Sequence, residues 1–68
     1  MDDTTGSDTL DRVASAYRIE DICELLGCSY HYVYRHIRSG ELPAYRISNS
    51  YRVARDDLSR WLDQRRVA

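Results

Sequence analysis

Two short apolar-periodic segments, separated by only three residues, constrain the fold of this chain more than any other feature. In the first, residues 19–26, apolar side chains recur at the spacing of one helix face, which predicts a short amphipathic helix. They are Ile19, Ile22, Leu25 and Leu26. Gly27 follows as a natural helix stop with a positive φ, and Ser29 can cap a second helix. Two helices joined by so tight a turn form a helix-turn-helix.

The second segment, residues 30–39, is predicted to be a helix with a basic outer face. Val33 and Ile37 form its buried stripe together with Tyr30, and Gly40 ends it. At about 100° per residue, the opposite face presents basic and aromatic side chains. These are His31, Arg35 and Arg38, flanked by Tyr32 and Tyr34.

Residues 44–55 are predicted to form a β-hairpin. Its loop length follows from the alternation of apolar and polar residues along the two strands. Apolar residues alternate along both strands. A two-residue loop at Asn49-Ser50 would place an apolar residue opposite an arginine. A three-residue loop, Ser48-Asn49-Ser50, keeps the apolar face consistent, so we expect this loop. It pairs Ile47 with Tyr51 and Tyr45 with Val53.

The three-residue loop places Arg46 directly opposite Arg52 on the outer face of the hairpin. Like charges opposed across a strand pair destabilise it, and a polyanion against that face would relieve the repulsion. The alternative is that both side chains splay into water. We favour the polyanion because the second helix also turns arginines outward. The net charge is −1, yet residues 29–55 hold five arginines and one glutamate.

A third helix is predicted near the end of the chain, and an acidic leader at its start. In residues 56–66, Leu58, Trp61 and Leu62 recur at helical spacing, and Trp61 is expected to anchor the core. Residues 1–15 carry four acids and one base without a sustained apolar period. We expect this leader to be mostly disordered, with at most a short helical turn near residues 9–16, and the folded domain to span residues 16–68.

Length and composition exclude several classes of protein. The 68 residues allow one domain, and a chain this short buries only about 60% of its unfolded surface. We therefore expect a small binding module rather than an enzyme with its own cleft. No run of apolar residues is long enough to span a membrane. Two cysteines make no disulfide framework, so we expect a reducing cytoplasm.

Two groups of reactive side chains suggest a metal site and a catalytic triad, but structural roles explain both groups. Cys23, Cys28, His31 and His36 have a spacing that suggests zinc. However, the cysteines fall at core positions, and the two histidines diverge by about 140° around their helix. Ser29 and His31 lack an orienting carboxylate, so no catalytic triad is expected. The sequence predicts no metal, no cofactor and no enzymatic activity.

Several motifs together carry a resemblance to a known family. They are Glu20-Asp21, Leu25-Leu26-Gly27, Ser29, Val33-Tyr34-Arg35, Gly40-Glu41-Leu42-Pro43-Ala44, Arg46-Ile47, Tyr51-Arg52, Arg55-Asp56-Asp57-Leu58 and Trp61-Leu62. In this order they resemble the excisionase-type winged helix-turn-helix, a small relative of the MerR DNA-binding domain. The resemblance covers residues 17–63. It implies an α+β, mostly helical fold: a helix-turn-helix, a two-stranded wing and a C-terminal helix.

The resemblance also implies a function in the cytoplasm of a bacterial host. The second helix would enter the major groove of double-stranded DNA, and the wing would lie over the adjacent minor groove or backbone. Phage excisionases bind repeated sites head-to-tail, bend the DNA and direct a tyrosine integrase toward excision, with no catalytic activity of their own. The DNA-binding residues implied here are Ser29, His31, Tyr32, Tyr34, Arg35, Arg38, Arg46, Asn49, Ser50 and Arg52.

Several positions depart from the family pattern. Arg18 stands where a Ser or Thr usually caps the first helix, and the wing tip lacks a glycine pair followed by a basic residue. Tyr30 and Tyr32 occupy positions that are often basic or Thr, so no base preference is carried over. Two other functions stay open: a small MerR-like transcriptional regulator, and an adaptor that binds protein instead of DNA. Salt-dependent DNA binding separates the adaptor from the other two.

Overall fold

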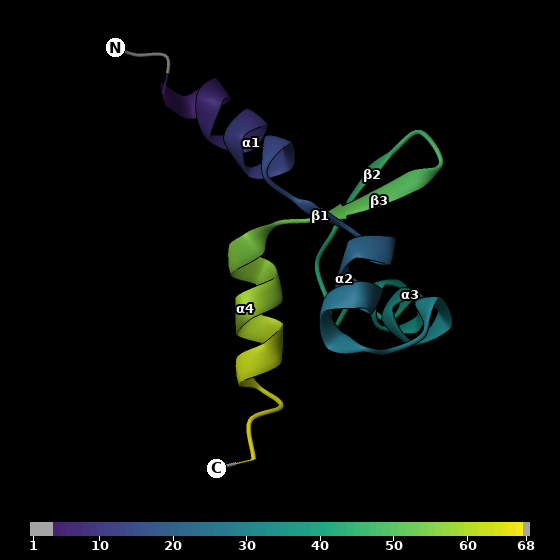
Figure 1. The fold of residues 1–68 in the computed structure, drawn as a ribbon. Coiled ribbons are helices and arrows are strands. Elements are labelled where there is room, and N and C mark those ends of the chain that lie inside the picture. Colours follow the sequence, from purple (N-terminus) through teal and green to yellow (C-terminus); the bar gives the residue numbers. More distant parts are fainter. Residues whose placement is uncertain (1–3, 68) are drawn as a thin grey trace.

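The chain folds as a small winged helix-turn-helix, as predicted (Figure 1). The structure, a computed structural model, describes residues 4–67; the disorder expected for residues 1–3 falls outside that range. The helices are α1 (Thr4–Ala14), α2 (Ile19–Leu26), α3 (Tyr30–Arg38) and α4 (Arg55–Asp63). The strands are β1 (Tyr17–Arg18), β2 (Tyr45–Ile47) and β3 (Ser50–Val53).

The core lies between α2, α3, β3 and α4. Its buried side chains are Ile19, Ile22, Val33, Leu42, Val53, Leu58 and Trp61. The indole of Trp61 is only 2% exposed, which confirms it as the core anchor. Burying its large apolar surface contributes strongly to the stability of so small a domain.

The turn between α2 and α3 has the predicted chemistry. Gly27 adopts φ 70°, and its N–H donates to the Cys23 carbonyl at 2.8 Å, which closes α2 in the left-handed conformation that glycine favours. The Ser29 hydroxyl accepts the Tyr32 N–H at 3.2 Å, so Ser29 is the N-cap of α3. At the start of α2, the Arg18 N–H donates to the Asp21 carboxylate at 3.2 Å. This bond is the Asp21 half of a capping box, and the side chain of Arg18 makes no cap hydrogen bond in return.

The sheet has three antiparallel strands in the order β1-β3-β2, one more than the predicted hairpin. Strand β1 pairs with β3 in the register Tyr17↔Val53 and Arg18↔Arg52. A strand of two residues has no detectable alternation in the sequence, because its existence depends on a partner far along the chain.

The predicted three-residue loop of the hairpin is wrong. The loop has two residues, Ser48 and Asn49, and the pairs are Tyr45↔Arg52, Arg46↔Tyr51 and Ile47↔Ser50. The parity argument placed Ile47 on the core face, but its side chain is 42% exposed. Ser48 adopts φ 59°, and a positive φ at the first loop residue alone is typical of a type II′ turn, which fits a two-residue hairpin.

The corrected register also removes the predicted Arg46–Arg52 pair. Arg46 lies opposite Tyr51, and residues adjacent in a strand point to opposite faces. Arg46 therefore shares the face of Tyr51 and Val53, whereas Arg52 shares the other face with Tyr45. Repulsion between Arg46 and Arg52 no longer supports a polyanion at the wing.

The leader contains a helix where mostly disorder was expected. Helix α1 is 11 residues long, and Arg12 near its end binds the rest of the protein. The Arg12 guanidinium donates to Asp56 at 2.7 Å, to Asp57 at 2.9 Å and to the Tyr45 hydroxyl at 3.3 Å. These partners lie more than 30 residues away in the sequence, so local periodicity gave no indication of them.

Candidate nucleic-acid interface

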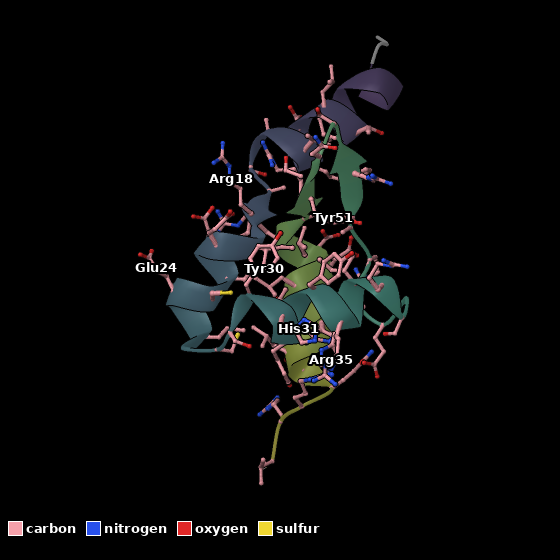
Figure 2. The ribbon with its side chains drawn as sticks, turned by 90° about the vertical axis from the view of Figure 1, so that its right-hand side faces the viewer. Arg18, Glu24, Tyr30, His31, Arg35 and Tyr51 are labelled. Carbon is pink, nitrogen blue, oxygen red and sulfur yellow. The ribbon has the colours of Figure 1, made fainter. Side chains whose placement is uncertain are left out.

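Helix α3 and the wing form one side of the molecule (Figure 1). The Ser29 cap fixes where α3 begins, and burial of Val33 fixes how the helix is rotated. His31 and Arg35 are exposed and lie one turn apart on the outward face of α3 (Figure 2). Arg38 is exposed on the next turn, and Tyr34 is half-buried beside it. The predicted outward position of His31, Arg35 and Arg38 agrees with the structure, whereas Tyr34 is half-buried and packs against the edge of the core.

Two tyrosines of α3 lie opposite to where the sequence placed them. Tyr32 faces the core, with its ring centroid 6.3 Å from that of Trp61 and 4.6 Å from that of His36. Tyr30 was assigned to the buried stripe, but it is 51% exposed and stacks on Tyr34 at 6.3 Å. The two edges of an apolar helix face look equivalent in the sequence. Here Trp61 of α4 covers the edge that bears Tyr32.

Arg38 is held in place by Tyr34. Its Nη1 donates to the Tyr34 hydroxyl at 3.0 Å, and its Cζ lies 5.8 Å from the centre of that ring. The hydrogen bond with Tyr34 raises the pKa of Arg38 further above its ordinary value, so the guanidinium stays cationic. Tyr34 in turn meets Tyr51 of β3 edge-on at 5.9 Å. This contact joins the outward face of α3 to the wing.

The wing carries two arginines on different faces. Arg46 is exposed and shares a face with Tyr51, so it lies on the side of the wing that contacts α3. Arg52 is half-buried on the other face, and its Nη1 donates to the Ser50 hydroxyl at 3.0 Å. Asn49 and Ser50 are exposed at the tip. The structure thus brings Arg46 toward the α3 residues and places Arg52 apart from them.

The arginines divide into those that bind acids and those that do not. Arg12, Arg60 and Arg65 make ion pairs with Asp56, Asp57 or Glu41 at 2.7–3.5 Å. By contrast, no carboxylate of residues 9–67 makes an ion pair with the other seven arginines. Four of these seven belong to α3 or the wing: Arg35, Arg38, Arg46 and Arg52. The other three are Arg18, Arg55 and Arg66. The α3 side therefore presents the positive charge of Arg35, Arg38 and Arg46, which the protein itself leaves uncompensated, and Arg52 adds charge on the other face of the wing.

The cysteine and histidine residues do not converge on a metal. Among the side chains of residues 9–67 the structure contains no group of three His, Cys, Asp or Glu that could hold one. Cys23 and Cys28 pack against the core, and burial raises the pKa of the Cys23 thiol, which disfavours the thiolate. Both ring nitrogens of His36 already have neighbours: Nδ1 donates to the Tyr32 carbonyl at 2.7 Å, and Nε2 lies 3.4 Å from Glu41.

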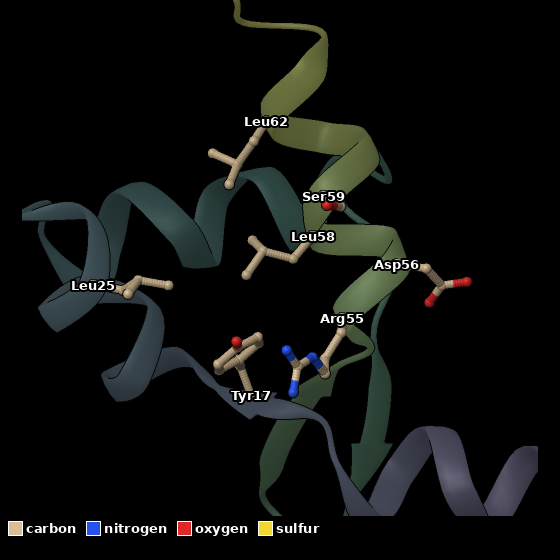
Figure 3. A pocket seen from close by; sticks show the side chains of 7 residues that line it. All are labelled: Tyr17, Leu25, Arg55, Asp56, Leu58, Ser59 and Leu62. Atoms are coloured by element: carbon tan, nitrogen blue, oxygen red, sulfur yellow. The ribbon is translucent and has the colours of Figure 1, made fainter.

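A groove of about 350 Å³ lies between α2 and α4 (Figure 3). Its lining residues are Tyr17, Leu25, Arg55, Asp56, Leu58, Ser59 and Leu62. None of them belongs to α3, β2 or β3, so this groove is separate from the basic side. None of the helices in the described part of the chain is long and apolar enough to cross a membrane.

Comparison with known proteins decides the family. Residues 16–66 match the profile of a family described as "Helix-turn-helix domain". The chain belongs to this helix-turn-helix family. It therefore carries a helix-turn-helix DNA-binding domain, and the exposed face of α3 is the part that such a domain turns toward DNA.

A longer protein shares much of this helix-turn-helix domain. The chain is 39% identical over 54 residues to a protein of Bacillus subtilis described as "Uncharacterized protein YvgK". The match covers 79% of this chain and 18% of that protein, so the chain spans about a fifth of its relative's length. No solved structure matches the chain.

Sequence reasoning misplaced Tyr30 and gave no structural role to Arg18. Tyr30 was assigned to the core, and its departure from the family's basic or Thr residue did not distinguish it from Tyr32, which departs in the same way and faces the core. Arg18 was treated only as an unusual cap, because the strand that contains it pairs with β3 through long-range contacts. Its replacement of a small capping residue by a cation was the available signal.

Proposed function

We propose that the protein binds double-stranded DNA sequence-specifically, with α3 in the major groove and the wing on the adjacent backbone. The observation that carries this proposal is the uncompensated charge of α3 and the wing. Arg35 and His31 would meet base edges, and Arg46 would contact phosphate. Ser29, Asn49 and Ser50 lie at the ends of these elements, where their polar groups would add contacts. Tyr32 is omitted, because it packs against Trp61.

Within this proposal the protein acts by binding and has no catalytic activity. In the bacterial cytoplasm it would bind repeated sites beside a phage attachment site, bend the DNA and direct a tyrosine integrase toward excision. The support for this role is the excisionase-type order of the motifs, together with the small surface that would contact the bases. A helix of 9 residues reaches only a few base pairs, so repeated sites would supply the specificity that one copy lacks.

Gel-shift titration at two salt concentrations tests the DNA binding. Arg35→Ala should weaken binding to the selected site by about 1–3 kcal/mol if Arg35 reads a base. Arg46→Ala should weaken binding to selected and random duplexes alike, as a phosphate contact does. Arg60→Ala is the matched control, because Arg60 pairs with acids of α4. Salt-independent binding, or unchanged affinity in both test variants, contradicts the assignment.

A footprint on the DNA around the gene tests the biological role. Repeated sites flanking an integrase core sequence support the excisionase role, and a circular-permutation mobility assay should then detect a bend. A lone operator over a promoter contradicts it and indicates a MerR-like regulator. An adaptor would leave no footprint at all.

A further inference from the structure

Strand β1 places two arginines directly opposite each other. In the β1–β3 register Arg18 pairs with Arg52, and side chains at paired positions of antiparallel strands point to the same face with their Cβ atoms about 5 Å apart. Like charges at that separation destabilise the pairing. The fold nevertheless retains both guanidinium groups on one small face of the sheet.

The neighbours of this pair leave its charge largely uncompensated. Tyr45 of β2 lies opposite Arg52 of β3 and points to the same face of the sheet. Its hydroxyl accepts the Nε–H of Arg12. Arg12 is itself neutralised by Asp56 and Asp57. The Asp21 carboxylate accepts the Arg18 backbone N–H at 3.2 Å, which is a bond to the main chain and not to the guanidinium. No carboxylate of residues 9–67 makes an ion pair with Arg18 or with Arg52.

One of the two guanidinium groups is already oriented. Arg52 Nη1 donates to the Ser50 hydroxyl at 3.0 Å and approaches the Tyr51 carbonyl at 3.5 Å. An arginine has five N–H donors, so several stay available for an acceptor between the strands. Arg18 is exposed, with its backbone fixed in an extended conformation at φ −83° and ψ 163°. Figure 2 shows Arg18 above Tyr30, and the register puts its side chain on the sheet face of Arg52.

We propose that Arg18 and Arg52 together bind one phosphate of the DNA backbone, a contact of β1 beyond those of α3 and the wing tip. This inference rests on the proposed DNA binding. A phosphate between the two guanidinium groups would accept charge-assisted hydrogen bonds from both, and its negative charge would relieve their repulsion. Guanidinium groups form such bonds with phosphate bidentately. The contact is sequence-independent, so it raises affinity for every duplex and fixes how the domain lies on the helix.

Titrations of single and double variants test the site. Arg18→Ala, Arg52→Ala and the double variant are titrated against a random-sequence duplex and against the sequence selected from a random library, at several salt concentrations. Each single variant should lose roughly three- to tenfold in affinity on both duplexes. The slope of log K against log salt should become shallower by about 0.9 in the double variant, which leaves that phosphate without a cation. The double variant should lose less than the product of the two single losses, because both arginines hold the same phosphate.

Controls separate this inference from the proposed function and from misfolding. Arg60→Ala should bind both duplexes like the wild type, and thermal unfolding without DNA should show no loss of stability in Arg18→Ala, because repulsion is removed. Arg18→Gln keeps most of the aliphatic stem and must show the same loss of affinity as Arg18→Ala. Wild-type affinity in Arg18→Ala and Arg18→Gln overturns the site, as does a wild-type slope in the double variant or a loss confined to the selected sequence. Absence of salt-dependent binding in the wild type overturns the proposed function instead.

Discussion

At the scale of single residues, Tyr34 does more than fill space beside the core. Its hydroxyl accepts a hydrogen bond from Arg38, and its ring contacts Tyr51. An arginine side chain loses considerable rotamer entropy when it becomes ordered at an interface. Tyr34 therefore lowers the cost of placing Arg38 against DNA by holding it before binding.

Replacing only the hydroxyl group of Tyr34 tests this preorganisation. Tyr34→Phe should lower DNA affinity roughly three- to tenfold, the value of about one hydrogen bond, with little change in thermal stability. In an Arg38→Ala background the same change should have almost no effect, because the hydroxyl then has no arginine to hold. Tyr32→Phe is the matched control, since Tyr32 lies on the core side of α3. Equal losses for Tyr34→Phe with and without Arg38 would contradict the coupling.

At the scale of elements, the turn between α2 and α3 depends on the backbone of Gly27. No atom lies within 4 Å of the position that a Cβ would occupy there, but φ is +70°. Gly27→Ala should therefore destabilise the fold by about 1–2 kcal/mol through backbone strain alone. Because a domain of this size shifts by about 4–8 °C per kcal/mol, the thermal midpoint should fall clearly. Gly27→Asn should cost less, since asparagine tolerates this conformation. Equal midpoints for both variants and the wild type would exclude the strain.

Helix α1 is attached through a contact that depends on pH. The hydrogen bond from Arg12 holds the pKa of Asp56 below its ordinary value. A carboxyl group with a lowered pKa in the folded state stabilises that state above its ordinary pKa, and this stabilisation disappears as the pH falls through the lowered value. NMR shifts of residues 9–14 should therefore show loss of α1 docking below about pH 4. Arg12→Ala should show that loss at neutral pH, whereas Arg66→Ala should behave like the wild type. An unchanged α1 in Arg12→Ala would contradict this attachment.

The elements also show where sequence reasoning succeeds. The Gly27 stop, the Ser29 cap and the Trp61 anchor were predictable because each depends on backbone geometry or spacing within one or two turns. The wing register was not, because it depended on whether Ile47 reaches the core, which only the assembled sheet decides. Strand β1 and the docking of α1 depend on partners more than 30 residues away. The positions of His31, Arg35 and Arg38 were predicted from helical periodicity, whereas the orientation of Tyr32 required the position of α4.

At the scale of the whole molecule, the helix-turn-helix of one copy offers DNA one recognition helix, α3, which has 9 residues. Such a surface contacts too few base pairs to distinguish one site among many genomic competitors. Copies on neighbouring sites can add their specificity if they touch each other, and head-to-tail contacts of this kind extend along DNA without closing into a ring. We therefore expect a monomer in free solution that assembles cooperatively on tandem sites.

Sedimentation and site spacing test this assembly together. Analytical ultracentrifugation without DNA should show a monomer, and three tandem sites should fill more steeply than one site. Inserting about 5 bp between sites turns the neighbouring copy to the opposite side of the duplex, since one helical turn is about 10–10.5 bp. Cooperativity should therefore disappear, while the affinity of each separate site stays the same. Inserting a full turn serves as the control for distance alone. A stable two-fold dimer in free solution, or independent filling of all three sites at the natural spacing, would contradict this assembly and favour an ordinary operator-binding regulator.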